Sequence, residues 1–307
     1  MTAPSGLTVG IWPTGAAYIN GRYVSVDEAA IPVTDWGYRR SDATYDVVGV
    51  WNGAFFRLDD HVRRFRNSMC ELRLAPPESD EEIRQVLAEC VRLSGLREAY
   101  VAVDCLRGKP KLGLARHPVN CSNYLAAFAI PWVWVVSQEV QRRGAHLMIA
   151  KTPRISEASI DPTVKNFHWG DLTRGLFEAH DCGADNCILL DTDGLVTEGP
   201  GFNVFAIVGG TVVTPDRGAL EGITRMSVLE LCNELEIPCE VRPMRAAELR
   251  EADEIFLATT AGGIMPASRI DGRILGNDSP GPLSTLLRET FWTKRAEGWH
   301  ATQIDYR

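Results

Sequence analysis

Apolar and polar residues alternate in short runs through the first third of the chain, and Asn-Gly pairs separate these runs. Asn20-Gly21 lies between AYI and RYV, and Asn52-Gly53 lies between VVGVW and AFFRL. An Asn-Gly pair between alternating runs is a strong hairpin signal, because a type I′ turn needs positive φ at both central residues. The pattern therefore predicts two β-hairpins.

Helical spacing of apolar residues follows these hairpins. Val62, Phe65 and Met69 fall on one face of a helix predicted over residues 59–72. Ser79 and Glu82 form a capping box, which predicts the start of a second helix. Further along, the pattern predicts strands over residues 100–106 and 124–136, and helices over residues 170–181, 224–235 and 282–297.

Turn signals continue into the second half of the chain, at Asp193-Gly194, Gly209-Gly210 and Asp271-Gly272. Many short-range hairpins with segregated helices indicate an α+β fold and not a doubly wound parallel sheet. No Gly-x-Gly-x-x-Gly motif follows a predicted strand, so a dinucleotide site is not supported. The polar segment 137–144 is predicted to link a smaller N-terminal α/β domain (1–136) to a larger C-terminal domain (145–307).

The composition narrows the class of protein. Apolar residues make up 45% of the 307, which is enough for a sizeable core, and the net charge of −8 argues against nucleic-acid binding. The most apolar stretch, residues 124–136, contains Pro131 and is too short to span a bilayer. The N-terminus shows no basic region followed by an apolar run, so we expect no signal peptide and no membrane partner.

Eight cysteines are scattered along the chain without a Cys-x-x-Cys pair, and the six histidines show no His-Glu-x-x-His pairing. Zinc sites and disulfide frameworks need clustered spacing. We therefore expect reduced cysteines, a cytoplasmic protein and no metal site.

Lysine is scarce: only Lys109, Lys111, Lys151, Lys165 and Lys294 occur. Lys165 differs from the others because Val164, Phe167 and Trp169 surround it. Burial lowers a lysine pKa, and a neutral amine can attack a carbonyl to form a Schiff base. The alternative from local context is a lysine that extends to solvent from a strand end.

Five blocks carry a resemblance to a known family. They are YDVVGVWNGAFFRLDDHVRRF, DPTVKNFHWGDLTRGLFEA, LVTEGPGFNVFAI, TPDRGALEGITR and DEIFLATTAGGIMP. In this order they resemble the fold-type IV pyridoxal-5′-phosphate enzymes, which include branched-chain and D-amino-acid aminotransferases, aminodeoxychorismate lyase and (R)-selective amine transaminases. The stretches KNFHWGDLTRGLFEA and TTAGGIMP are most similar to the (R)-amine transaminases. The resemblance implies a two-domain α+β fold with the cofactor site between the domains, pyridoxal phosphate as cofactor, and a homodimer with its active site at the interface.

The resemblance also implies roles for individual residues. Lys165 falls on the Schiff-base lysine, and Glu198 falls on the carboxylate that faces the pyridine nitrogen. Arg64 matches the arginine that grips the phosphate, with Arg63 as the alternative. The remaining cofactor residues that it implies are Asn203, which fixes the loop or orients Glu198, Leu220, which packs on the ring, and the phosphate donors Ile223, Thr224 and Thr260.

Fewer residues of the expected substrate pocket match positions of the family. Tyr45 matches a position that faces the substrate, and Val47, Trp51, Phe56, Trp169 and Ala261 are candidates for the pocket walls. For the aromatic residues among them, plain core packing is the favoured alternative. The sequence departs from the (R)-amine transaminases near Gly113, where those enzymes carry an arginine that binds the keto-acid carboxylate. Another cation must replace it if keto acids are used, and the candidates are Arg39, Arg40, Lys109, Lys111 and Arg116.

The predicted activity is transfer of an amino group between an (R)-amine or D-amino acid and a keto acid such as pyruvate. The alternatives are a D-amino-acid aminotransferase, a branched-chain L-amino-acid aminotransferase and a lyase of the aminodeoxychorismate type. The block KNFHWGDLTRGLFEA argues against the lyase. A cofactor-free aldolase would have no need for Glu198 and the phosphate donors. A binding module would leave the anion site and the buried Lys165 unexplained.

Overall fold

The computed structural model describes residues 11–307, and these form two compact units. The first unit contains residues 11–133, 164–167 and 298–307, and the second contains residues 134–163 and 168–297. The segment predicted as a linker, 137–144, carries the short helix α4 (Gln138–Arg143) and belongs to the second unit. Two short stretches of the C-terminal half, 164–167 and 298–307, belong to the first unit.

The first unit is built on a seven-stranded sheet in which all neighbouring strands are antiparallel. Its order is β16 (Ala301–Gln303), β4 (Ala54–Phe56), β3 (Ala43–Trp51), β5 (Ala99–Leu106), β6 (Tyr124–Pro131), β1 (Ala16–Ile19) and β2 (Arg22–Ser25).

Both predicted hairpins are present in this sheet. Asn20-Gly21 joins β1 to β2 and Asn52-Gly53 joins β3 to β4, with positive φ at all four residues. The strand predicted over residues 124–136 is too long, because β6 ends at Pro131. Its partner β5 begins at Ala99, opposite Pro131, so the residues that follow have no strand to pair with.

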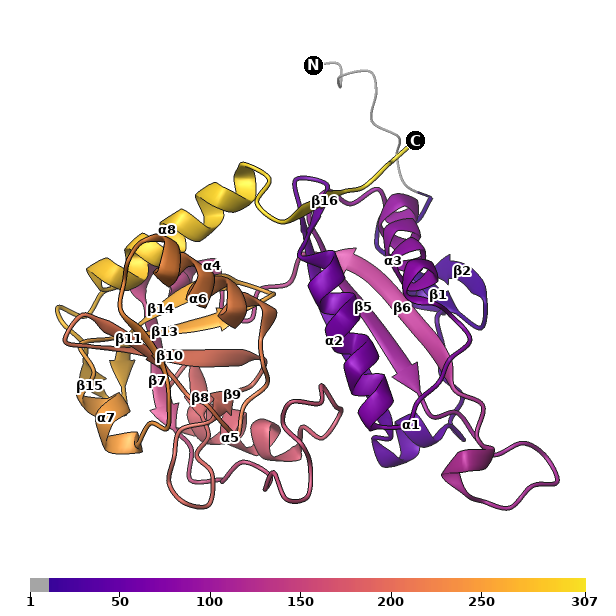
Figure 1. The fold of residues 1–307 in the computed structure, drawn as a ribbon, viewed down its shortest axis with the longest axis horizontal. Helices are drawn as coiled ribbons and strands as arrows, with labels where there is room; N and C mark the ends of the chain where they lie inside the picture. Colours follow the sequence, from indigo (N-terminus) through magenta and orange to yellow (C-terminus); the bar gives the residue numbers. More distant parts are fainter. Residues whose placement is uncertain (1–10) are drawn as a thin grey trace. The chain divides into compact units, whose positions relative to one another are not determined.

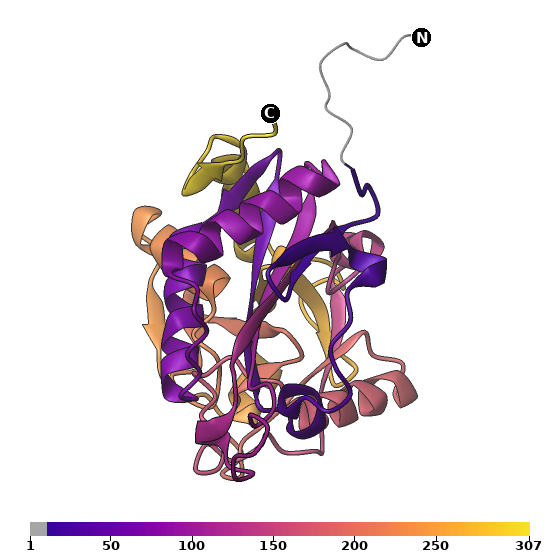
Figure 2. The same cartoon turned by 90° about the vertical axis from the view of Figure 1, so that its right-hand side faces the viewer.

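Two helices cover one face of this sheet, as Figure 2 shows. They are α2 (Leu58–Glu71) and α3 (Asp80–Ser94). The predicted capping box is confirmed: the Ser79 side chain accepts from the Glu82 backbone N–H, and Glu82 accepts from the Ser79 N–H. Apolar residues of both helices pack against alternate residues of β3 and β5, including Val48, Val101 and Val103.

The second unit is built on a nine-stranded mixed sheet. Its main order is β12 (Cys239–Val241), β11 (Thr211–Thr214), β10 (Phe202–Val208), β13 (Glu254–Thr259), β14 (Gly263–Ile270), β7 (Ala145–Ile149) and β8 (Asn186–Ile188). Two further strands, β9 (Glu198–Gly199) and β15 (Arg273–Ile274), pair with β10 and β14. The pairs β11–β12, β14–β7 and β7–β8 are parallel, and the other pairs are antiparallel.

Helices pack on this second sheet, and all but the short helix Ala246–Glu251, which was not predicted, have ends close to those predicted. They are α5 (Gly170–Asp181), α6 (Ile223–Glu234), α7 (Ala246–Glu251) and α8 (Pro282–Ala296). Figure 1 shows α6 and α8 beside β13 and β14, and α5 lies against β8. The short helix α1 (Trp36–Arg40) belongs to the first unit. The predicted α+β class is confirmed.

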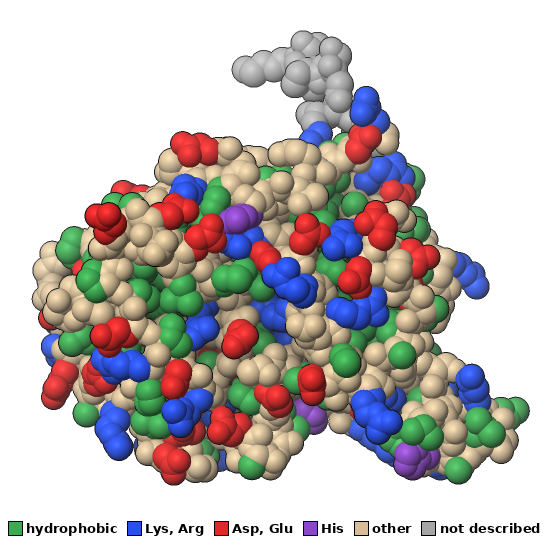
Figure 3. Space-filling view, viewed as in Figure 1, with side chains coloured by type: hydrophobic (Ala, Val, Ile, Leu, Met, Phe, Trp, Pro, Cys, Tyr) green, Lys and Arg blue, Asp and Glu red, His purple; other side chains and the backbone are tan. Residues whose placement is uncertain are grey.

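Several general properties bear on the sequence predictions. Within residues 11–307, no helix is both long and apolar enough to cross a bilayer. The eight cysteines, all in this part of the chain, are free thiols. Acidic and basic side chains are interspersed on the face shown in Figure 3.

Candidate active site

Residues 164–167 run along the edge of β3, and this places Lys165 in the first unit. Thr44 and Asn166 form an antiparallel bridge. The Lys165 carbonyl accepts from the Thr44 hydroxyl at 2.6 Å and from the Tyr45 N–H at 3.2 Å. The Lys165 N–H donates to the Ser68 hydroxyl of α2 at 3.2 Å. Lys165 is therefore held by a strand on one side and by a helix on the other.

The side chain of Lys165 is half-buried against an aromatic ring. Its Nζ lies 4.3 Å from the ring centroid of Tyr45, and Tyr45 stacks on Phe167 with ring centroids 5.1 Å apart. A lysine ammonium over the face of a tyrosine is attracted by the ring quadrupole. Tyr45 is therefore one of the contacts that position this amine.

The two neighbouring arginines of α2 have different surroundings. Arg64 donates from Nε and Nη2 to the two carboxylate oxygens of Asp46, at 2.8 Å each, and its side chain is only 12% exposed. Arg63 is 64% exposed and pairs with Asp60 at the surface. Of the two, Arg64 is the side chain that a buried anion could reach.

Asp46 and His61 complete a buried charged cluster that the sequence analysis missed. His61 Nδ1 lies 2.7 Å from Asp46 Oδ1, and both side chains are almost fully buried. Burial alone would raise the pKa of Asp46, but Arg64 and His61 hold that pKa far below its usual value. Burial lowers the pKa of His61 against the opposing effect of Asp46. The sequence feature that could have indicated this cluster was the spacing of His61 and Arg64, one turn apart on a predicted helix.

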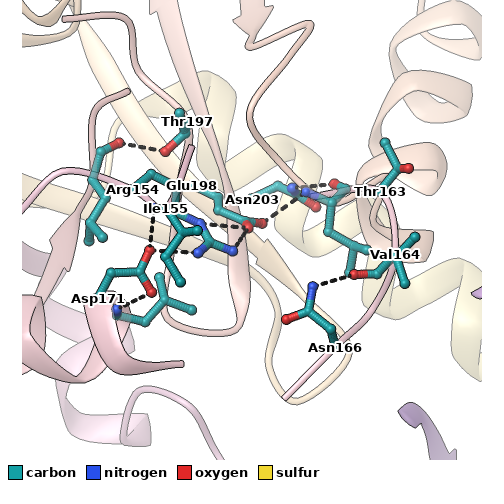
Figure 4. Close-up of polar contacts among 12 residues, drawn as sticks. Arg154, Ile155, Thr163, Val164, Asn166, Asp171, Thr197, Glu198 and Asn203 are labelled. Atoms are coloured by element: carbon teal, nitrogen blue, oxygen red, sulfur yellow. Dashed lines mark hydrogen bonds and ion pairs between the residues drawn. The ribbon is translucent and has the colours of Figure 1, made fainter. Parts of the chain in front are cut away.

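In the second unit, Glu198 belongs to a buried ion-pair triad, drawn in Figure 4. Arg154 donates to Glu198 Oε1 from Nη2 at 2.9 Å and from Nε at 3.3 Å, and from Nη1 to Asp171 at 2.6 Å. Burial would lower the pKa of Arg154, but Glu198 and Asp171 raise it above its usual value. The other Glu198 oxygen accepts from the Leu220 N–H at 3.0 Å. Sequence reasoning missed Arg154, because nothing near it in the chain indicates its partners.

Asn203 fixes the loop that carries Leu220. It pairs with Glu198 across β9 and β10, and its amide donates to the Leu220 carbonyl at 2.8 Å. A Cβ on Gly222 would lie 2.0 Å from the Asn203 oxygen, so the loop can approach only because residue 222 is glycine. These contacts bring Glu198, Asn203 and Leu220 together.

The residues predicted to bind phosphate in the second unit are close to this loop in the fold. Ile223 and Thr224, both buried, are the first residues of α6, and no side chain caps this helix. The first N–H groups of a helix have no partner within it and bind anions well. Thr260 directly follows β13, which pairs with β10, and its neighbour Thr259 donates to the Gly201 carbonyl at 2.7 Å.

The expected substrate residues are distributed over both units. Val47 is buried on β3, two residues from Tyr45, whereas Arg40 stacks on Trp36 at 3.5 Å and Arg39 lies beside it in α1. Trp51 packs edge-on against Trp132, and Phe56 packs against Trp299. Trp169 precedes α5, and Ala261 is buried with its carbonyl accepting from the Val135 N–H. The other candidate cations, Lys109, Lys111 and Arg116, lie between β5 and β6.

The family of the chain follows from comparison with known proteins. The model of the amino-transferase class IV family matches residues 43–270. This range includes Arg64, Lys165, Glu198, Thr224 and Thr260. The chain belongs to the class IV aminotransferases, and it is a pyridoxal-phosphate-dependent aminotransferase.

Individual relatives carry related names. A putative branched-chain-amino-acid aminotransferase of Methanocaldococcus jannaschii is 31% identical over 89% of this chain and 94% of its own length. A D-alanine aminotransferase of Bacillus licheniformis is 30% identical over 91% of this chain and 98% of its own length. The crystal structure of a branched-chain amino acid aminotransferase from Thermobaculum terrenum in its PLP form superposes with a TM-score of 0.84, at 27% identity, covering 96% of this chain and 99% of that one.

The residues of this chain fit pyridoxal phosphate by their chemistry. The cofactor has an aldehyde, a pyridine nitrogen and a phosphate. The chain offers a half-buried amine at Lys165, a buried carboxylate at Glu198 and a helix start at Ile223 without a side-chain cap. The substrates of such an enzyme are small molecules.

Proposed function

We propose that this aminotransferase moves an amino group between an (R)-amine or a D-amino acid and a keto acid such as pyruvate, with Lys165 as the residue that carries the cofactor. The observation that supports this assignment most is the position of the Lys165 amine, half-buried and 4.3 Å from the ring centroid of Tyr45. When it is bound, the cofactor supplies an aldehyde that condenses with amines and a ring that accepts electrons.

Lys165 has two tasks in this proposal. Its amine would hold the cofactor through the aldehyde in the resting enzyme, and after release it would take the proton from the donor carbon and pass it to the cofactor. The backbone contacts to Thr44, Tyr45 and Ser68 hold the base of the side chain, so that only its outer part has to move.

The cofactor ligands are proposed from both units. Lys165 and Arg64 belong to the first unit, and Glu198, Asn203, Leu220, Ile223, Thr224 and Thr260 belong to the second. The Glu198 carboxylate would accept a hydrogen bond from the protonated pyridine nitrogen and so favour that form of the ring, with Arg154 and the Leu220 N–H fixing the direction of the carboxylate. Arg64, the start of α6 and the two threonines would hold the phosphate.

The donor class rests on the sequence blocks and on the relatives. The blocks KNFHWGDLTRGLFEA and TTAGGIMP support an (R)-amine, and the D-alanine aminotransferase relative supports a D-amino acid. A branched-chain L-amino acid is the second candidate, because the M. jannaschii relative carries that name. The relatives compared above are aminotransferases, so the lyase is not favoured.

The keto-acid carboxylate needs a cation. Arg39 and Arg40 in α1, and Lys109, Lys111 and Arg116 in the loop after β5, are the proposed candidates. Each of the five residues is exchanged for alanine in a separate variant, and one of these variants should show a selectively raised KM for pyruvate. If none of the five variants changes this KM, the proposed carboxylate site is wrong.

Two broader features complete the proposal. A homodimer with the active site at its interface is expected from the family resemblance, and sedimentation velocity would measure it. A cytoplasmic location agrees with eight free thiols, which persist in a reducing compartment.

The test of the proposed function is an absorbance spectrum of the purified protein before and after addition of a donor. (R)-1-phenylethylamine, D-alanine and L-leucine are added separately, and the visible cofactor band should fall with the (R)-amine or with D-alanine. A fall with L-leucine alone would move the assignment to the branched-chain class. A protein that cannot be reconstituted with pyridoxal phosphate would overturn the assignment of Lys165.

Lys165→Ala should lower turnover by about a thousandfold or more, because both the covalent attachment and the proton transfer are lost. The variant should still bind pyridoxal phosphate without a covalent bond, which equilibrium dialysis would detect. Lys151→Ala, which changes an exposed lysine, is the matched control and should keep wild-type turnover. Retention of wild-type turnover by Lys165→Ala would contradict the proposal.

A further inference from the structure

Lys165, Tyr45 and Asp104 lie in one row across three neighbouring segments of the first unit. The antiparallel bridge between Thr44 and Asn166 places Lys165 opposite Tyr45, and the register of β3 and β5 places Tyr45 opposite Asp104. Residues paired across antiparallel strands have side chains on the same face. Since neighbouring strands are about 4.8 Å apart, the Lys165 and Asp104 backbones are separated by about 10 Å.

This face of the sheet is the one that α2 and α3 leave uncovered. The residues of β3 and β5 that pack against these helices, Val48, Val101 and Val103, alternate with Tyr45 and Asp104 along the strands. A carboxyl group on the same face as the proposed cofactor lysine is therefore not a part of the helix-covered core.

The carboxyl of Asp104 has no opposite charge beside it. Within residues 11–307 it makes no hydrogen bond or ion pair, although its side chain is half-buried. The titratable groups around it are Tyr45 on β3, Tyr100 on β5 and Tyr124 on β6, with Lys165 beyond Tyr45. Tyr124 is itself bonded to Asp35 at 2.9 Å. Burial raises the pKa of Asp104 to about 7.

We propose that Asp104 selects amino donors that carry a second cationic group, such as an ammonium or a guanidinium, several bonds from the reacting amine. The proposal rests on the proposed function of Lys165. A donor whose amine reaches Lys165 along this row would pass Tyr45, and its far end would meet the Asp104 carboxyl. A cation there supplies the missing counter-charge and favours the ionised carboxylate, whereas an anionic group is repelled. A half-buried pair is also screened less by water than an exposed pair.

The experiment compares donors of matched length on the holoenzyme. D-lysine, D-norleucine and D-glutamate, and the same three L-enantiomers, are assayed for kcat/KM with pyruvate between pH 6 and pH 9. For the preferred enantiomer, kcat/KM for lysine should exceed that for norleucine by about tenfold or more at pH 8.5. This ratio should fall towards pH 6 as the Asp104 carboxylate becomes protonated.

Two variants separate selection from a structural role. Asp104→Asn keeps the shape of the side chain and removes its charge. The lysine-to-norleucine ratio of kcat/KM should therefore fall to about one and lose its pH dependence, while kcat/KM for norleucine stays within about threefold of the wild-type value. Glu98→Gln removes an exposed carboxylate just before β5 and should keep the ratio. Asp104→Thr, with a residue favoured in strands, replaces Asp104→Asn if that variant does not fold.

The outcomes distinguish the two proposals. Equal losses for lysine and norleucine in Asp104→Asn, or no lysine preference in the wild type, would overturn the role of Asp104. If no donor changes the cofactor spectrum in any folded protein, the proposed function itself fails.

Discussion

Replacement of Arg154 by methionine tests whether the triad in the second unit stabilises the fold. The change removes a 2.6 Å contact to Asp171 and contacts of 2.9 and 3.3 Å to Glu198, while keeping a long apolar stem. Both carboxylates are buried. Breaking a buried ion pair by removal of one partner costs about 3–5 kcal/mol, because an uncompensated charge remains. Each carboxylate keeps backbone N–H donors, from Leu220 for Glu198 and from Ile155 for Asp171, which favours the lower end of this range.

The assay is urea unfolding of the apoprotein at pH 7 and at one protein concentration. The free energy of unfolding should fall by about 3–5 kcal/mol in Arg154→Met. The double variant Arg154→Met/Glu198→Gln removes one of the two unpaired charges and should recover about 1–2 kcal/mol of this loss. Arg142→Met, at an exposed arginine of α4, is the control and should change stability by less than about 0.5 kcal/mol.

A loss of less than about 1 kcal/mol in Arg154→Met would refute the reasoning, since the interaction would then be worth no more than a surface ion pair. The absence of any recovery in the double variant would show that repulsion from Glu198 is not the cause of the loss.

Two further predictions concern the first unit. Asp46→Asn should lower the free energy of unfolding by about 3 kcal/mol or more, because Arg64 loses its buried counter-charge, and should raise the dissociation constant of pyridoxal phosphate by about tenfold. Urea unfolding and cofactor titration measure both effects, and Asp59→Asn at the exposed start of α2 is the control. The free energy of unfolding of Asp104→Asn, measured relative to that of wild type, should rise by about 2 kcal/mol as the pH increases from 5.5 to 8. The folded-state pKa of Asp104, about 7, lies above its unfolded value near 3.8, so this carboxyl stabilises the wild type at low pH, and that stability is lost as pH rises through 7. Unfolding curves at both pH values measure the change, and a difference between the proteins that does not vary with pH would contradict it.

Local signals predicted much of the secondary structure. Asn20-Gly21 and Asn52-Gly53 form turns with positive φ, and the capping box of Ser79 and Glu82 begins α3. These features depend on neighbours within a few residues, so the sequence shows them directly.

Such local signals could not show which residues far apart in the chain pair with one another. The strand predicted through residue 136 ends at Pro131 because its partner β5 begins at Ala99. Arg154 was missed because Asp171 and Glu198 are 17 and 44 residues away in the chain. The cofactor roles of Lys165 and Glu198 came from the family resemblance and stay predictions.

The path of the chain has a consequence for engineering. The chain leaves the second unit after residue 163, contributes four residues to the first unit, and returns at residue 168. It enters the first unit again at residue 298, where β16 pairs with β4. A gene fragment that ends near residue 133 would therefore encode the first unit without the segment 164–167, which carries Lys165, and without β16. Exchange of whole units between relatives by a single crossover would separate this lysine from Thr44 and Ser68. A chimaera that keeps the whole first unit together needs four junctions, after residues 133, 163, 167 and 297.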